Sequence, residues 1–94
     1  MIALSQGPQL PLGKVVITPG AAAKIPPNEV QSAVQRHARG DWGELDANDR
    51  AANDRAVQRG SAVASIFRSS NGMKFYVLTE GDRSVTTVLL PEEY

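Results

Sequence analysis

Three short apolar segments joined by two turns occupy residues 61–90, and they constrain the fold more than any other part of the chain. Asn71-Gly72 is the strongest hairpin signal, because both residue types tolerate the positive φ angles of a tight two-residue turn. Gly81-Asp82 marks a second turn of the kind that joins strands. The sequence therefore predicts a meander of three antiparallel strands.

Helices and one further strand are predicted ahead of the meander. Lys14–Thr18 is a β-branched run that is typical of a short strand. Residues 18–25 predict one or two helical turns, with a threonine cap followed by a proline. Pro27–Arg39 carries apolar side chains at helical spacing, and Asp46–Arg59 begins with a residue type that caps helices. A glycine follows each of these last two segments and favours its end there.

These elements predict a single α+β domain over residues 13–94. Its order is strand, helix, helix and three antiparallel strands, with the two helices packed on one face of a mainly antiparallel sheet. The first strand is expected at an edge of the sheet or paired with the last strand. Residues 1–12, which are interrupted by proline and glycine, are predicted to form a flexible N-terminal arm.

Both faces of the predicted meander carry large apolar side chains; for example, Phe75 and Val77 alternate with Tyr76 and Leu78. Two slim helices can cover only one face. At about 25 cal/mol per Å², about three or four uncovered side chains would cost several kcal/mol, which is large for a domain of this size. The second face therefore needs the arm or a partner, and we expect a protein partner or a homodimer.

Composition excludes several classes of function. Ten Lys and Arg balance ten Asp and Glu, so a role that depends on coating nucleic acid is not expected. The chain has no cysteine, which removes thiolate chemistry, disulfides and Cys-based metal sites. The first residues lack the basic and apolar regions of a signal peptide, and no run approaches the ~20 apolar residues of a membrane span. We expect a soluble, cytoplasmic protein.

Residues that could carry out catalysis are few. His37 could act as a general base oriented by Asp41, or it could end the apolar stripe of its helix at the core edge, which is the interpretation we favour. Glu80 and Asp82 share a side of a strand end, but no third ligand accompanies them. We therefore predict no catalytic residue, no metal site and no cofactor, and a binding protein rather than an enzyme.

The linker Asp41-Trp42-Gly43-Glu44 is the best candidate for a contact surface. Trp42 could be an exposed anchor for a partner, or it could fill the seam between the helices and the sheet. The residues that we predict to contact a partner are Asp41, Trp42, Glu44, Tyr76 and Arg83.

The stretches LPLGKVVITPGA, HARGDWGELD and LTEGDRSVTTVLLPEEY resemble a group of small proteins carried on bacterial plasmids and integrative elements. Some members of that group are labelled as related to restriction–modification systems. The resemblance spans residues 10–94, and Gly81 stands where a small residue such as alanine is expected. It implies a mobile-element setting and carries no catalytic residue with it.

The function predicted from the sequence is that of a non-enzymatic interaction protein of a mobile element, which binds a host protein, an element-encoded protein or itself. An alternative rests on topology, which is similar to that of ribosome-dependent RNase toxins of the RelE type. Those toxins place basic and aromatic residues on the sheet, where this chain offers Arg68, Lys74, Tyr76 and Arg83. The neutral net charge counts against this alternative.

Overall fold

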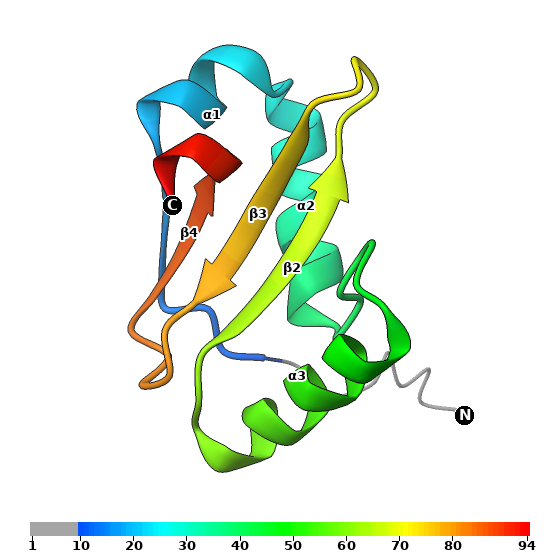
Figure 1. Cartoon of the computed structure of the whole chain (residues 1–94). Coiled ribbons are helices and arrows are strands. Elements are labelled where there is room, and N and C mark those ends of the chain that lie inside the picture. Colours follow the sequence, from blue (N-terminus) through cyan, green and yellow to red (C-terminus); the bar gives the residue numbers. More distant parts are fainter. Residues whose placement is uncertain (1–9) are drawn as a thin grey trace, which may run out of the picture.

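The computed structural model describes residues 10–94 and confirms the α+β class (Figure 1). In the described part of the chain the elements follow one another as β1 (Lys14–Ile17), α1 (Pro19–Lys24), α2 (Pro27–Ala38), α3 (Ala47–Arg59), β2 (Val63–Arg68), β3 (Lys74–Thr79), β4 (Val85–Leu89) and the short 3-10 helix η1 (Pro91–Glu93). The helical turns predicted after the first strand form α1, which Thr18 caps through its side chain.

The four strands form one sheet in the order β1-β4-β3-β2. The three strands of the predicted meander pair antiparallel, as expected. β1 pairs with the last strand, β4, and this pairing is parallel, so the sheet is mixed. The register places Val15 beside Thr86 and Ile17 beside Val88. β1 and β2 are therefore the two edge strands.

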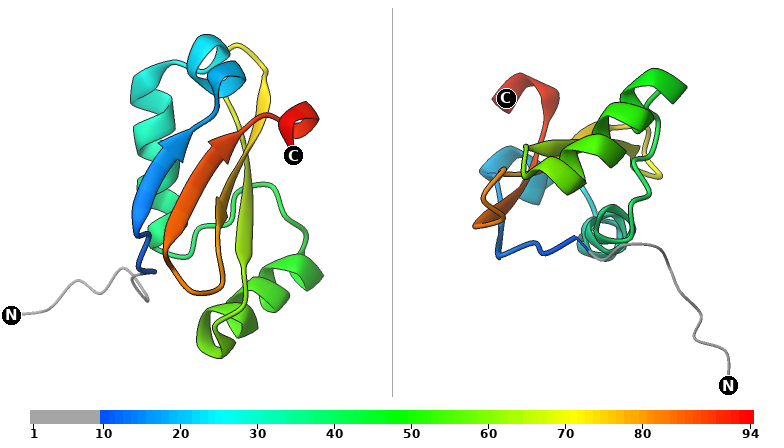
Figure 2. Two further views of the ribbon diagram at one scale, coloured as in Figure 1. Left: turned by 90° about the vertical axis from the view of Figure 1, so that its left-hand side faces the viewer. Right: turned by 90° about the horizontal axis from the view of Figure 1, so that it is seen from below.

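The main core lies between one face of the sheet and helices α1 and α2. Phe67, Phe75, Val77 and Val88 are buried on this face, which we call the helix face. Figure 2 (left) shows α2 on one side of the sheet and η1 on the other. The helices contribute the small residues Ala21 and Ala33 together with Ile25, so they lie close to the strands.

Helix α3 does not share the helix face, which corrects the prediction that both longer helices cover it. It lies across the end of the sheet at which β2 begins (Figure 1). None of its residues is buried, and only Ala56 and Val57 pack on a second, smaller core around Trp42 and Val63. The physical reason is the thin apolar side of this helix, which offers too little area to cover a sheet face.

The end of the predicted arm is packed in the structure. Leu10 is buried, and its N–H donates to the carbonyl of Ala38 at 2.8 Å. The carbonyl of Leu12 accepts from the hydroxyl of Thr86 at 2.8 Å. Both contacts lie on the side of the helix face. The rest of the predicted arm, residues 1–9, lies outside the described residues.

The opposite side of the sheet, which we call the outer face, has no helix layer over its centre. Its side chains alternate with those of the helix face, and most are half-buried. They are Val16, Ala64, Ile66, Tyr76, Leu78, Val85 and Thr87, with Leu89 buried. Among the described residues, the large apolar side chains that are exposed are Val15 and Ile17 on β1 and Tyr94, whose ring meets that of Tyr76 on the outer face. None of the helices in residues 10–94 is long and apolar enough to cross a bilayer.

Candidate protein-binding edge

His37 lies inside the core and has no exposed surface. Its Nδ1 atom is 2.5 Å from the hydroxyl of Ser65 on β2, and its Nε2 atom is 2.8 Å from the hydroxyl of Thr79 on β3. Thr79 in turn bonds to Thr86 on β4 at 2.7 Å, and Thr86 donates to the Leu12 carbonyl. We call these four side chains the His37 chain. It ties α2 to three strands through the middle of the core.

The Leu12 carbonyl at the end of the His37 chain determines which group donates in each hydrogen bond of the chain. A carbonyl only accepts, so the hydroxyl of Thr86 donates to Leu12 and must accept from Thr79. The hydroxyl of Thr79 therefore accepts from the Nε2–H of His37, and Nδ1 accepts from Ser65. Both ring nitrogens of the neutral imidazole are thus satisfied.

Burial, together with the smaller effect of the positive charge of Arg83, lowers the pKa of His37 from 6.5 to about 4. A neutral imidazole with both nitrogens engaged and no access to solvent holds the fold together and has no free nitrogen for a substrate. Asp41, the expected orienting partner, instead forms an ion pair with Arg36 at 2.7 Å. The structural interpretation of His37 is therefore the one that the geometry supports.

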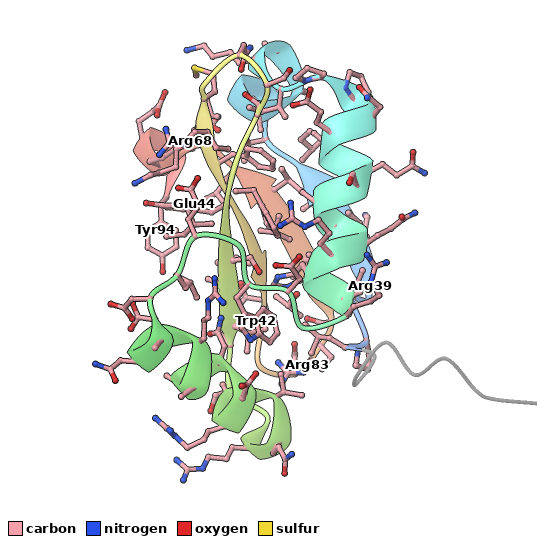
Figure 3. All side chains as sticks on the ribbon, turned by 90° about the vertical axis from the view of Figure 1, so that its right-hand side faces the viewer. Arg39, Trp42, Glu44, Arg68, Arg83 and Tyr94 are labelled. Atoms are coloured by element: carbon pink, nitrogen blue, oxygen red, sulfur yellow. The ribbon has the colours of Figure 1, made fainter. Side chains whose placement is uncertain are left out.

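Trp42 fills the seam between α2, α3 and the sheet, the second of its two possible roles. Its exposed fraction is 4%, and its ring stands edge-on to that of His37 with the centroids 5.4 Å apart. Its indole N–H donates to the carboxylate of Asp54 on α3 at 3.0 Å. Figure 3 shows Trp42 between the end of α2 and α3. A side chain so covered offers little area to a partner.

A hollow of about 340 Å³ lies beside Trp42, between the end of α2 and α3. Its lining is mixed, with Arg39 and Asp54 next to Leu10 and Val57. The Asp54 carboxylate is already an acceptor for the indole N–H. The hollow therefore reflects the loose fit of α3 on the small core more than a set of groups aimed at a ligand.

The linker that carries Trp42 closes one edge of the sheet. The carbonyl of Ile66 on β2 accepts from the N–H of Glu44 at 2.8 Å, and the N–H of Ile66 donates to the carbonyl of Trp42 at 3.2 Å. The amide of Asn53 on α3 donates to the carbonyl of Ala64 at 2.8 Å. Figure 3 looks onto this edge, with the linker running across it. The outward backbone groups in the middle of β2 are therefore paired within the chain.

The two acidic residues predicted to contact a partner lie along this closed edge. Asp41 pairs with Arg36, and that hydrogen bond holds the pKa of the Asp41 carboxyl below its usual value. Glu44 receives both Nε and Nη2 of Arg68, each at 3.2 Å. These pairs are half-exposed, so they help to position the linker and contribute little stability.

Arg83 lies in the turn between β3 and β4 with φ of 62°, an unusual angle for a residue other than glycine. Its guanidinium donates to carbonyls of Ala56, Val57 and Ser61, at the C-terminal end of α3, and to the carbonyl of Glu80, at distances of 2.7–3.3 Å. A cation at a helix C-terminus neutralises the free carbonyls there. Arg83 therefore joins α3 to the meander.

Tyr76 lies on the outer face, where its ring stands edge-on to that of Tyr94 at 6.0 Å between centroids. The five residues predicted to contact a partner are thus spread over three places: the linker on the β2 edge, the outer face, and the turn before β4. The structure does not bring them together into one surface.

The other edge of the sheet, formed by β1, is open. The N–H of Lys14 donates to the carbonyl of Ser84, just before β4, and the N–H of Thr18 donates to the carbonyl of Val88 in β4, each at 3.0 Å. Because the backbone groups of a strand alternate in direction, those of Val15 and Ile17 point away from the sheet. Within residues 10–94, no group bonds to them. Figure 2 (left) looks onto this edge, which we call the β1 edge.

The β1 edge also carries exposed apolar side chains. Val15 is 47% exposed and Ile17 is 41% exposed. Both lie on the helix face, beside the buried Thr86 and Val88 of β4. They lie beyond the cover that α1 and α2 provide. This site was not predicted from the sequence, although a signal was present. Lys14–Thr18 was expected at an edge of the sheet or paired with the last strand, and no charge or proline interrupts its apolar residues.

Comparisons of the chain with protein-family models, with curated proteins and with solved structures find no match.

Proposed function

We propose that this protein is a non-enzymatic interaction module that binds an extended segment of a protein along the β1 edge. The observation that carries the proposal is the contrast between the two edges of the sheet. The β2 edge is closed by the linker and Asn53, whereas β1 presents unpaired backbone groups flanked by exposed Val15 and Ile17. An open apolar edge is a ready template for an added strand.

The placement of the polar residues supports binding over catalysis. His37 is buried and neutral, Arg83 is engaged by backbone carbonyls, and Arg68 is engaged by Glu44. An RNase of the RelE type would need such basic side chains free to reach the phosphate of a substrate. Here Arg68 and Arg83 are engaged within the fold, and of the basic residues expected on the sheet only the exposed Lys74 could reach a substrate. One lysine gives the toxin alternative little support.

The chemistry of the β1 edge suggests what a partner must offer. A backbone in extended conformation can accept from the N–H groups of Val15 and Ile17 and donate to their carbonyls. Specificity then comes from side chains that pack on the two exposed apolar residues. A host protein, an element-encoded protein or a second copy of this chain would satisfy these needs, and the mobile-element setting stays a prediction from the sequence resemblance.

Site-specific photocrosslinking tests the proposal. A photoreactive phenylalanine analogue in place of Ile17 is expected to form covalent adducts with protein in the cell that produces the chain. The same analogue in place of Lys74, which is exposed on β3 and far from the β1 edge in the strand order, is the matched control. Adducts should disappear when Val15→Pro is added, because proline removes the outward N–H of residue 15.

Two results would overturn the proposed function. One is an adduct pattern that is the same for the two positions, because the β1 edge would then have no special role. The other is cleavage of RNA by the purified protein that is lost in Arg83→Ala while the fold is retained, which would favour the RNase alternative.

A further inference from the structure

We infer that the strand accepted by the β1 edge is β1 of a second copy, so that two chains join their sheets across a twofold axis at Val16. This inference rests on the proposed function and names its partner. It follows from how the outward groups of β1 are spaced, from the side chains that flank them and from the charges at the two ends of the strand.

The backbone of β1 is complementary to itself in the antiparallel direction. The outward groups belong to Val15 and Ile17, one residue on each side of Val16. A twofold axis at Val16 places Val15 opposite Ile17 of the second copy, and Ile17 opposite Val15 of the second copy. Residues in such pairs exchange both of their N–H···O bonds. All outward groups of the two strands are then satisfied together, with none left over.

The same register brings like side chains together. Val15 and Ile17 lie on one side of the strand, so the four side chains of the two copies form one apolar patch beside the helix face. Val16 meets Val16 of the second copy on the outer face. These β-branched pairs are favourable across antiparallel strands. The pairing therefore covers the two exposed apolar side chains of β1 in each copy.

The charges at the ends of β1 select a second copy over an unrelated strand. The register places Lys14 opposite Thr18 of the second copy. The Thr18 hydroxyl donates to the Glu93 carboxylate at 2.5 Å, so a negative charge stands beside Thr18. Neither Lys14 nor Glu93 has a charged partner of opposite sign within residues 10–94. Each Lys14 can thus pair with the Glu93 carboxylate of the other copy, twice by symmetry.

The short strand limits the strength of the assembly. β1 has four residues, so the contact area is below the ~1,200 Å² of a typical stable interface. We therefore expect a dimer that dissociates on dilution. The first measurement is therefore the proportion of dimer as a function of protein concentration.

The experiment combines sedimentation equilibrium with amide hydrogen exchange on the pure full-length chain. The wild-type protein is expected to pass from monomer to dimer as its concentration rises. The exchange of the amide protons of Val15 and Ile17 should slow over the same range, while other exposed amides are unaffected. Val15→Pro should weaken the dimer by about tenfold or more, because it removes an interchain donor without touching a bond to β4.

A charge pair of variants tests the register. Lys14→Glu should weaken the dimer by about threefold to tenfold at low salt, and the effect should fade in 1 M salt. Lys74→Glu makes the same change at another exposed lysine and should leave the dimer unchanged. A circular dichroism spectrum like that of the wild type establishes that each variant is folded.

The outcomes separate this inference from the proposed function. A chain that stays monomeric at millimolar concentration overturns the second copy as the partner. If Ile17 still crosslinks to a different protein in cells, the proposed function survives that result. If neither Val15→Pro nor Lys14→Glu changes the dissociation constant of the dimer, the dimer uses another surface and the inference is wrong. Protection of the Val15 and Ile17 amides in the dilute monomer would overturn it too, because the edge would then be covered within one chain.

Discussion

The buried His37 makes the stability of this protein depend on pH in a window where few other groups titrate. Its pKa is lowered from 6.5 to about 4 in the folded state, mainly by burial. Between pH 6.5 and pH 4, the histidine binds a proton in the unfolded chain but stays neutral in the folded chain. The folded state therefore loses stability as the pH falls from 6.5 toward 4, and the loss levels off below about pH 4.

The size of this effect follows from the two pKa values. Each unit of pKa difference corresponds to about 1.36 kcal/mol. From pH 7 to pH 5, the free energy of unfolding should fall by about 2 kcal/mol through His37 alone. Several carboxyls with lowered pKa, including those of Glu29, Asp41 and Glu93, add their own losses only at lower pH. The interval above pH 5 therefore isolates the histidine.

Two assays check the prediction. Chemical denaturation at closely spaced pH values measures the free energy of unfolding of the wild type and of His37→Gln, which cannot titrate and should lack the slope. Proton NMR of the imidazole follows the titration directly, and the assignment is unambiguous because the chain has one histidine. A midpoint near 6.5 in the folded protein, or an equal slope in His37→Gln, would refute the reasoning.

Further predictions concern glycines and Arg83, and each is checked by chemical denaturation. Gly43→Ala should cost about 3 kcal/mol and promote aggregation, because φ is 74° and a Cβ atom would lie 1.9 Å from the Ile66 carbonyl oxygen that holds the linker on β2. Gly72→Ala is its control, since φ is 85° but nothing lies within 4 Å, and a cost of only about 1 kcal/mol is expected. Gly81→Ala should cost about 1–2 kcal/mol through a Cβ atom 2.7 Å from the Gly60 carbonyl oxygen; a neutral result would mean that the two turns move apart easily. Arg83→Ala should cost about 1–3 kcal/mol because the C-terminal carbonyls of α3 lose their donor. The prediction is contradicted if hydrogen exchange shows that the amides of α3 stay as protected as in the wild type.

Gly81 shows why a resemblance in sequence needs the structure beside it. A small residue such as alanine was expected there from the resemblance, but a Cβ atom at this position would lie 2.7 Å from the Gly60 carbonyl oxygen, so glycine is the small residue that fits. Gly60 ends α3 in a left-handed conformation, and the following loop returns to β2 past the turn at Gly81. The two glycines are thus coupled through space, across a distance in sequence that local patterns do not report.

Local patterns predicted the elements well for identifiable reasons. The capping roles of Thr18 and Asp46 depend on neighbours within a few residues, and the structure has both. A turn also forms at Asn71-Gly72, but it runs from Ser69 to Gly72, and only Gly72 of the pair has a positive φ. The antiparallel meander follows from those turns because short connections leave strands few ways to pair. The parallel pairing of β1 with β4 was left open, since the two strands are separated by most of the chain.

The His37 chain was only half foreseen. The stripe of α2 placed the histidine toward the core, but its partners Ser65, Thr79 and Thr86 come from three different strands. A signal existed, because these polar residues fall at core positions that alternate with outward ones in the strands. It became readable only with the register, which brings their hydroxyls within hydrogen-bonding distance of the ring and of one another.

By itself the sequence determined where helices, strands and turns form, because those choices depend on the spacing of apolar residues and on caps within a turn or two of each position. Only the tertiary structure decided which edge of the sheet is closed and which is open. That outcome depends on where the linker of Trp42 and the amide of Asn53 come to rest against β2, and on the absence of any such cover over Val15 and Ile17 among residues 10–94. Contacts of this kind join segments that are distant along the chain, so their energies exist only once the whole domain has assembled.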